Sequence, residues 1–113
     1  MPAIVISMDS RKMENPDLDI RYILPDRIEK WSNGAVTDDG YEYIDEDGHI
    51  LGVWLETEDP EGWWPKIVEL LNAERFCGND LSRSSLVLIS EESGAEIGNC
   101  RQVWPENRKE EAL

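Results

Sequence analysis

The alternation of apolar and polar residues divides the chain into short segments with the periods of strands and helices. Residues 3–8 are apolar on both parities, which is typical of a strand covered by neighbours inside a sheet, and residues 85–90 predict another strand. Residues 49–57 are similarly rich in apolar residues and also predict an inner strand. Residues 35–44 alternate poorly and contain Gly40, which favours a bulged strand at the edge of a sheet.

The residues that follow the first strand predict a helix. Asn15-Pro16 predicts the start of this helix, because asparagine caps helices and proline fits the first turn. We expect Pro25 to interrupt the helix, since proline lacks a backbone donor, and a second helical piece to cover 25–33. The apolar stripe of these pieces is formed by Leu24, Ile28 and Trp31.

The strongest helical pattern covers residues 62–77, which carry a broad apolar face and are followed by Gly78 as the expected stop. Upstream of it, Asp47-Gly48 predicts a hairpin turn between the bulged strand and the strand that follows. Near the other end of the chain, residues 95–104 predict a last, irregular strand whose apolar parity changes near Cys100.

The predicted order is therefore strand, helix, strand, strand, helix, strand, with one extra C-terminal strand. This is the order βαββαβ of a ferredoxin-like split βαβ sandwich. Right-handed crossovers would place 3–8 in parallel beside 49–57 in a mixed sheet, with 85–90 on its other side and the helices on one face. We predict a single compact α+β domain over 1–104 and a charged tail over 105–113.

Length and charge narrow the class of protein. A chain of 113 residues fits one domain with one core, and its formal net charge of −14 argues against direct binding to nucleic acid or anionic membrane. The first residues lack the basic region of a signal peptide, and no stretch approaches membrane-spanning length. We therefore expect a cytoplasmic protein in which Cys77 and Cys100 are free thiols.

The charge is concentrated in one window. Between Lys30 and Lys66 there is no Lys or Arg, whereas acidic residues and most of the aromatic residues lie there. An acidic surface with interspersed aromatic side chains suits the binding of a basic protein. Tyr41 and Tyr43 share one face of the expected edge strand and are the aromatic residues most suited to contact it, whereas Trp54 fits the core better. The candidate partner-binding residues are Asp38, Asp39, Tyr41, Glu42, Tyr43, Asp45, Glu46, Asp47, Glu58, Asp59, Glu61 and Trp63.

Catalytic and metal-binding patterns are weak. His49 is the single histidine, so no histidine-based catalytic set can be argued from the sequence. His49, Cys77 and Cys100 are widely separated, which does not fit zinc. Aligning Gly48 with the glycine of an EF-hand loop puts Tyr43 at the first ligand position, so that motif fails, and only weak calcium binding to the acidic turn stays open. We expect no cofactor.

Three functions fit these observations. The leading hypothesis is a non-enzymatic acidic binding module, in its sharpest form an inhibitor or immunity-type protein that masks a basic nuclease toxin. One alternative is a small dimeric ferredoxin-like enzyme or ligand-binding domain that uses its sheet face, which a deep pocket containing His49 or Tyr43 beside a shifted carboxylate would favour. The other is an accessory subunit whose acidity serves solubility alone. A homodimer through a sheet edge or face also stays open.

Overall fold

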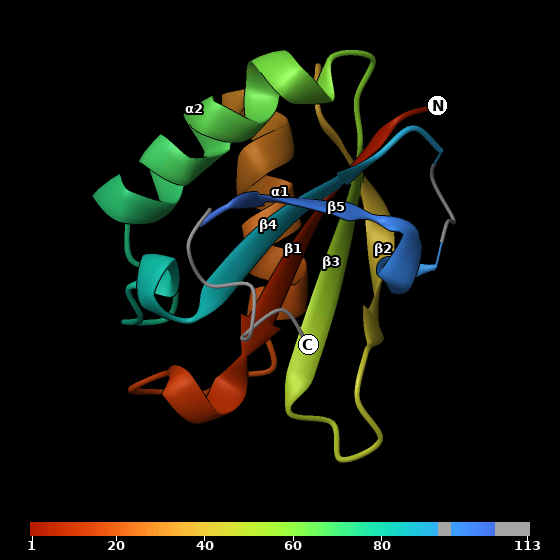
Figure 1. Ribbon diagram of the computed structural model, residues 1–113. Helices are drawn as coiled ribbons and strands as arrows, with labels where there is room; N and C mark the ends of the chain where they lie inside the picture. The colour runs from red at the N-terminus through yellow and green to blue at the C-terminus, as the bar shows by residue number, and fades with distance from the viewer. Residues whose placement is uncertain (93–95, 106–113) are drawn as a thin grey trace.

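The computed structural model describes residues 1–92 and 96–105. Within these ranges it is an α+β protein with a five-stranded antiparallel sheet and two α-helices packed against it (Figure 1). The strands are β1 (Ala3–Asp9), β2 (Thr37–Tyr43), β3 (Ile50–Glu56), β4 (Ser85–Ser90) and β5 (Arg101–Trp104). The α-helices are α1 (Ile20–Trp31) and α2 (Pro60–Ala73), and short 3₁₀ turns cover Ser10–Lys12, Leu81–Arg83 and Ile97–Asn99.

The strand order of the sheet is β2-β3-β1-β4-β5, so β1 is an inner strand and β2 an outer one. β4 lies beside β1 with Ala3 opposite Ser90 and Met8 opposite Ser85, which confirms the position predicted for residues 85–90. β3 lies on the other side of β1, with Ile4 opposite Leu55. The apolar strands thus lie inside the sheet, where neighbours cover them on both sides.

The predicted parallel pairing of residues 3–8 with 49–57 is wrong, and so is the mixed sheet. β1 pairs with β3 antiparallel, and β3 pairs with β2 antiparallel. α1 returns the chain, so β1 and β2 run in the same direction, and the hairpin then reverses the chain. A strand that follows this hairpin and lies between β1 and β2 is therefore antiparallel to both. The ferredoxin-like arrangement stays a prediction.

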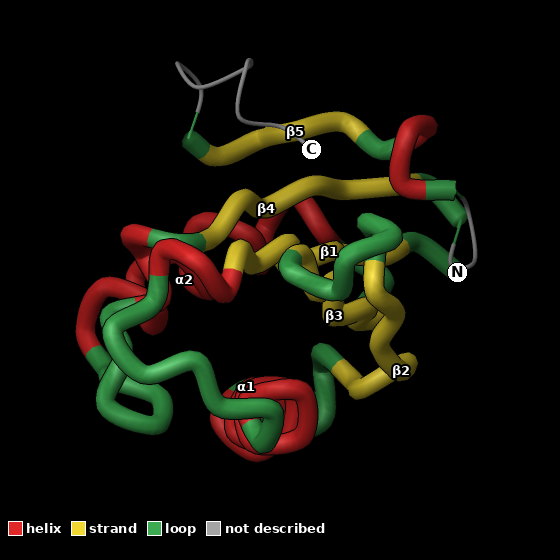
Figure 2. Tube along the Cα trace, turned by 90° about the horizontal axis from the view of Figure 1, so that it is seen from below, coloured by secondary structure: helices red, strands yellow, loops and turns green. Residues whose placement is uncertain are grey.

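Both helices lie on one face of the sheet, as Figure 2 shows from below. Alternate residues of β1 point toward them, because successive side chains of a strand face opposite sides. Ile4, Ile6 and Met8 share a buried core with Leu24 of α1 and Ile67 of α2. On the other face, a smaller buried cluster is formed by Ala3, Val5, Trp54, Leu86 and Leu88, with Ile97 and Cys100 packed against it.

The first helix begins later than predicted and is not interrupted. α1 begins at Ile20, because Asn15 does not cap a helix but exchanges hydrogen bonds with Asn79. Pro25 lies inside the helix and is buried. It removes one backbone donor, whose partner would be the carbonyl of Arg21, and the burial of Leu24 and Ile28 on the predicted stripe compensates for that loss.

The second helix is displaced by a few residues from the prediction of 62–77. It begins after Asp59, whose carboxylate accepts a hydrogen bond from the Gly62 N–H at 3.0 Å, and it ends at Ala73. Gly78 has a φ of 81°, in the left-handed region that glycine adopts readily, but it serves a turn beyond the helix. That turn is closed by paired backbone hydrogen bonds between Phe76 and Asn79.

The last strand is shorter than the predicted 95–104. β5 covers Arg101–Trp104, and a 3₁₀ turn over Ile97–Asn99 precedes it. The pairing of β5 with β4 shifts register between Val87 and Leu88. The change of apolar parity expected near Cys100 falls between the 3₁₀ turn and the start of β5. Ala95 lies outside the described residues, as does the predicted tail beyond Pro105.

Candidate functional site

The candidate site is built on β2, the outer strand of the β2–β3 hairpin. Its residues from Asp38 to Tyr43 are all exposed. A β-bulge interrupts the pairing with β3 between Asp38 and Tyr41. Gly40 makes the bulge because its φ of 95° lies in the left-handed region, and its N–H donates to Asp38 Oδ1 at 2.9 Å. β2 is therefore an exposed edge with a defined break.

Beyond the bulge, two tyrosines point to the helix side of the sheet. Tyr41 is opposite Val53 and Tyr43 is opposite Leu51, and both of these partners belong to the core under the helices. Both tyrosine side chains stay substantially exposed, at 41% and 42%, because β2 is the outermost strand of the sheet formed by the described residues. Tyr41 and Tyr43 are therefore accessible, and their contact with a partner stays a prediction.

Tyr22 of α1 completes an aromatic group that we call the tyrosine cluster: Tyr22, Tyr41 and Tyr43. The rings meet edge to face, with centroids 5.8 Å apart for Tyr22 and Tyr41 and 6.3 Å apart for Tyr41 and Tyr43. Tyr22 is 52% exposed. Edge-to-face contacts favour defined orientations of aromatic rings, so the cluster is a preformed aromatic surface.

Arg21 lies within this surface. Its Cζ is 4.7 Å from the ring centroid of Tyr22 and 5.4 Å from that of Tyr41, distances at which a guanidinium is attracted to a ring face. A hydrogen bond from Tyr41 lowers the pKa of Tyr22, and the charge of Arg21 acts in the same direction. The cluster therefore contains one delocalised cation held against its rings.

The sequence does not reveal Tyr22 and Arg21 as members of the site. A signal was present, because Tyr22 lies off the apolar stripe of α1 formed by Leu24, Ile28 and Trp31. A large aromatic residue on the polar side of a helix indicates an exposed surface. Which strand that surface adjoins depends on the packing of α1 against β2, which only the structure provides.

Glu42 points to the opposite face of the sheet from the tyrosines. Its Oε1 accepts a hydrogen bond from Trp54 Nε1 at 3.1 Å, and Trp54 is buried among the residues of the smaller cluster. Asp38 is opposite Leu55 of the core under the helices, so it lies on the same face as the tyrosines. Of these β2 residues, Glu42 lies on the other face.

The turn of the hairpin carries Asp45, Glu46 and Asp47. Asp45 Oδ1 accepts a hydrogen bond from the Ile50 N–H at 2.8 Å, and this bond lowers the pKa of the Asp45 carboxyl. Carboxylate oxygens of Asp45 and Asp47 and a ring nitrogen of His49 lie within 4.8 Å of one another. This spacing fits a divalent cation, but all three side chains are at least partly exposed.

A second acidic group lies at the other end of the hairpin, where β3 leads into α2 (Figure 1). Glu56, Glu58 and Asp59 line an open hollow of about 380 Å³ together with Trp63. Partial desolvation raises the pKa of the Asp39 carboxyl, and the negative charge of Glu56 raises it further. The acidic residues between Lys30 and Lys66 are thus divided between the two ends of the β2–β3 pair, which is about 20 Å long.

Three of the predicted partner-binding residues at this second end have structural roles. Asp59 caps α2. Glu61 forms an exposed ion pair with Arg101 at 3.1 Å. Trp63 packs edge to face on Trp31, with ring centroids 5.6 Å apart. The tyrosine cluster and the acidic turn of Asp45, Glu46 and Asp47 are therefore better candidates for partner contact than this end of the hairpin.

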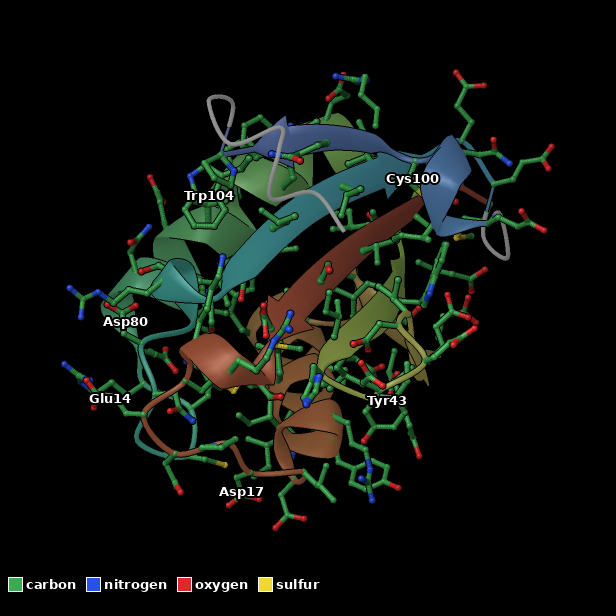
Figure 3. The ribbon with its side chains drawn as sticks, turned by 60° about the horizontal axis from the view of Figure 1, so that its bottom comes forward. Glu14, Asp17, Tyr43, Asp80, Cys100 and Trp104 are labelled. Atoms are coloured by element: carbon green, nitrogen blue, oxygen red, sulfur yellow. The ribbon has the colours of Figure 1, made fainter. Side chains whose placement is uncertain are left out.

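A small hollow lies beside the tyrosine cluster. It has a volume of about 120 Å³ and is lined by Met8, Met13, Leu18, Tyr43 and His49, among others. Figure 3 shows two of its lining residues, Asp17 and Tyr43, on the same lower side of the molecule. It is smaller than the roughly 300–1,000 Å³ of most ligand pockets, so its size suits a single side chain of a partner better than a substrate.

Comparison with known protein families, with curated protein sequences and with solved structures finds no match to this chain. Within the described residues, no helix is long and apolar enough to span a membrane. The site is therefore interpreted from its geometry and charge.

Proposed function

We propose that this protein is a protein-binding module, and that the outer edge of β2 with the tyrosine cluster contacts a basic protein. The observation that carries the proposal is the exposed, edge-to-face arrangement of Tyr22, Tyr41 and Tyr43 on an outer strand next to an acidic turn. Rigid aromatic side chains commonly provide most of the binding energy of an interface. The carboxylates around them favour partners with positive charge.

In its sharpest form the partner is a nuclease-type toxin and the protein is its inhibitor. The active site of a nuclease carries basic side chains that bind phosphates. Carboxylates of Asp45, Glu46 and Asp47 would take the places of those phosphates, while Tyr41 and Tyr43 would anchor the contact and exclude the substrate. This mechanism requires no catalytic group on the inhibitor.

We also propose that the fold is a split βαβ arrangement with one extra strand. In the proposed split βαβ arrangement, each helix connects two strands that run in the same direction, with a third strand between them. The unit β1-α1-β2 with β3 between its strands, and the unit β3-α2-β4 with β1 between its strands, support this interpretation. The order of the whole sheet differs from a four-stranded one by β5. Fold by itself does not identify function.

The test begins by capturing the partner from native cells on the immobilised protein at low and high salt. The rates of association and dissociation are then measured across a salt series. Screening over about 8 Å at physiological ionic strength should slow association as salt rises. The triple reversal of Asp45, Glu46 and Asp47 to Lys should mainly lower the association rate, and Tyr41→Ala should mainly raise the dissociation rate.

A matched control reverses three exposed acidic residues outside the window, Glu69, Glu91 and Glu92, to Lys. This control changes the net charge by the same amount. If both triple variants lowered the association rate equally, the cause would be the net charge of the protein and not the position of Asp45, Glu46 and Asp47. Binding that ignores both salt and the reversal of Asp45, Glu46 and Asp47 would reject the proposal.

A further inference from the structure

The direction of the backbone groups on β2 determines which atoms of this edge are available to a partner. The N–H of Ile44 donates to the carbonyl of Ile50 at 2.8 Å, so Ile44 and Ile50 are a hydrogen-bonded pair of the hairpin. In an antiparallel pair, hydrogen-bonded and non-hydrogen-bonded positions alternate. Since Tyr43 is opposite Leu51 and Glu42 opposite Gly52, Glu42 points its backbone groups toward β3. Tyr41 and Tyr43 point theirs outward.

We propose that β2 binds its partner by strand addition, with the backbone N–H and C=O groups of Tyr41 and Tyr43 pairing with an extended, basic segment. This inference rests on the proposed function and specifies how the partner is held. A strand added to an exposed edge gains affinity from main-chain hydrogen bonds and specificity from alternate side chains. The bulge at Gly40 ends the usable edge on one side and the acidic turn ends it on the other.

The charges on β2 define the chemistry of the added strand. Its residues opposite Tyr41 and Tyr43 would lie on the side of the tyrosine cluster, where apolar side chains fit. The residue between them would lie beside Glu42, whose second carboxylate oxygen can accept a bond from Lys or Arg while Oε1 holds Trp54. A segment in which apolar and basic residues alternate therefore fits this edge.

A second copy of the chain fits the edge poorly. In the antiparallel pairing that places Tyr41 of one copy opposite Tyr43 of the other, Glu42 faces Glu42. Like charges directly opposite one another destabilise a sheet, and each copy carries a net charge of −14. The same carboxylates that attract a basic strand thus disfavour self-association.

The experiment uses a short peptide of alternating valine and lysine, with blocked ends, as the probe. Its control is the same peptide with N-methyl groups on the amides that would face β2, which keeps the charge and removes the donors. Amide hydrogen exchange on the full chain should show new protection at Tyr41 and Tyr43 and no change at Glu42. The methylated peptide should bind about tenfold more weakly, since a few hydrogen bonds are lost.

Two variants test the same inference from the protein side. Tyr43→Ala removes the ring and keeps the N–H, whereas Tyr43→Pro removes both, and an outward-facing edge position tolerates proline. We expect Tyr43→Pro to bind the peptide about tenfold more weakly than Tyr43→Ala. If Tyr43→Pro does not fold, the methylated peptide makes the same comparison on the unaltered chain.

The outcomes separate this inference from the proposed function. Equal binding of both peptides, together with loss of binding in the Asp45, Glu46 and Asp47 reversal, would overturn strand addition and retain the acidic binding surface. Binding that is insensitive to salt and to the reversal would overturn the proposed function itself. A dimer in sedimentation that Tyr43→Pro dissociates would assign the edge to a second copy and also overturn the inference.

Discussion

Trp54 donates a hydrogen bond from its indole Nε1 to Glu42 Oε1 at 3.1 Å, on the face of the hairpin opposite to the tyrosine cluster. The bond joins the outer strand β2 to the inner strand β3 and satisfies the polar atom of a side chain that is only 7% exposed. Glu42 thus supports the hairpin from one face while its neighbours Tyr41 and Tyr43 form the exposed surface on the other. This division of roles leads to the first prediction.

Glu42→Ala should lower the free energy of unfolding by about 1 kcal/mol, because the buried indole N–H loses its acceptor. Urea denaturation followed by tryptophan fluorescence measures this change. Glu46→Ala at the exposed turn is the matched control and should leave stability unchanged. Equal stability of the two variants would show that the Trp54 bond contributes nothing to the hairpin.

Asn79 should be among the most sensitive polar positions. It is 1% exposed, accepts from the Asn15 N–H at 2.8 Å and donates to the Asn15 carbonyl at 2.7 Å. Asn79→Ala would leave both backbone groups without these partners and should cost about 2–3 kcal/mol in urea denaturation. Asn72→Ala, at an exposed position of α2, should cost far less. A similar loss in both variants would contradict this role.

Trp63→Ala should reduce the stability of the folded protein. Trp63 packs on Trp31, and Lys66 Nζ lies 4.7 Å from its ring centroid. Removing a half-buried tryptophan should cost about 2 kcal/mol, less than a fully buried one. Tyr43→Ala, which removes an aromatic side chain with more exposure, should be milder. Chemical denaturation of both variants checks this order.

Asp39 and Asp45 should influence the pH dependence of stability in opposite directions. The pKa of Asp39 is raised by partial desolvation and by Glu56, so the folded state holds its proton more tightly, and ionisation above about pH 4 is destabilising. The pKa of Asp45 is lowered by the Ile50 N–H, so its contribution is present above about pH 4 and lost as pH falls through the folded pKa.

Thermal melting of two variants separates these effects. Asp39→Asn should raise the Tm at about pH 7 and lose this advantage at about pH 3, where the carboxyl of the unaltered protein is protonated. Asp45→Asn should lower the Tm at neutral pH and match the unaltered protein in acid. A shift of the same sign for both variants at neutral pH would contradict the opposite pKa directions.

The two cysteines should react slowly in the folded protein. Neither Cys77 nor Cys100 is in a disulfide, both are half-buried, and burial raises the pKa of each thiol. Less thiolate is then present at mildly alkaline pH, and the thiolate is the reactive form. Thiol titration should be slow before denaturation and should reach two equivalents afterwards. Two fast equivalents in the native protein would contradict the burial of these groups.

The sequence predicted well those elements whose pattern is local. Residues 3–8 are apolar on both parities because inner strands are covered on two faces, and β1 is an inner strand with β4 beside it, as predicted. The poor alternation of residues 35–44 and the glycine among them predicted a bulged outer strand, which β2 is. The exposure of Tyr41 and Tyr43 was expected from the same edge position.

Tertiary structure decided what depends on contacts between distant residues. Asn15 lies before a proline, as a helix cap would, but its pairing with Asn79 competes for its polar groups and the helix begins at Ile20. Pro25 stays inside α1 because the packing of its neighbours outweighs one lost hydrogen bond. The antiparallel pairing of β1 with β3 follows from the direction in which the chain returns, which residue patterns do not encode.

The same distinction holds for the site. The sequence by itself determined that an acidic, aromatic segment forms an outer hairpin, because charge and turn residues are local properties. Only the tertiary structure brought Tyr22 and Arg21 of α1 onto Tyr41, turned Glu42 toward Trp54 on the other face, and gave Glu61 its partner Arg101. Side-chain neighbours across elements depend on how a helix packs on a sheet, and that packing is set by the whole core.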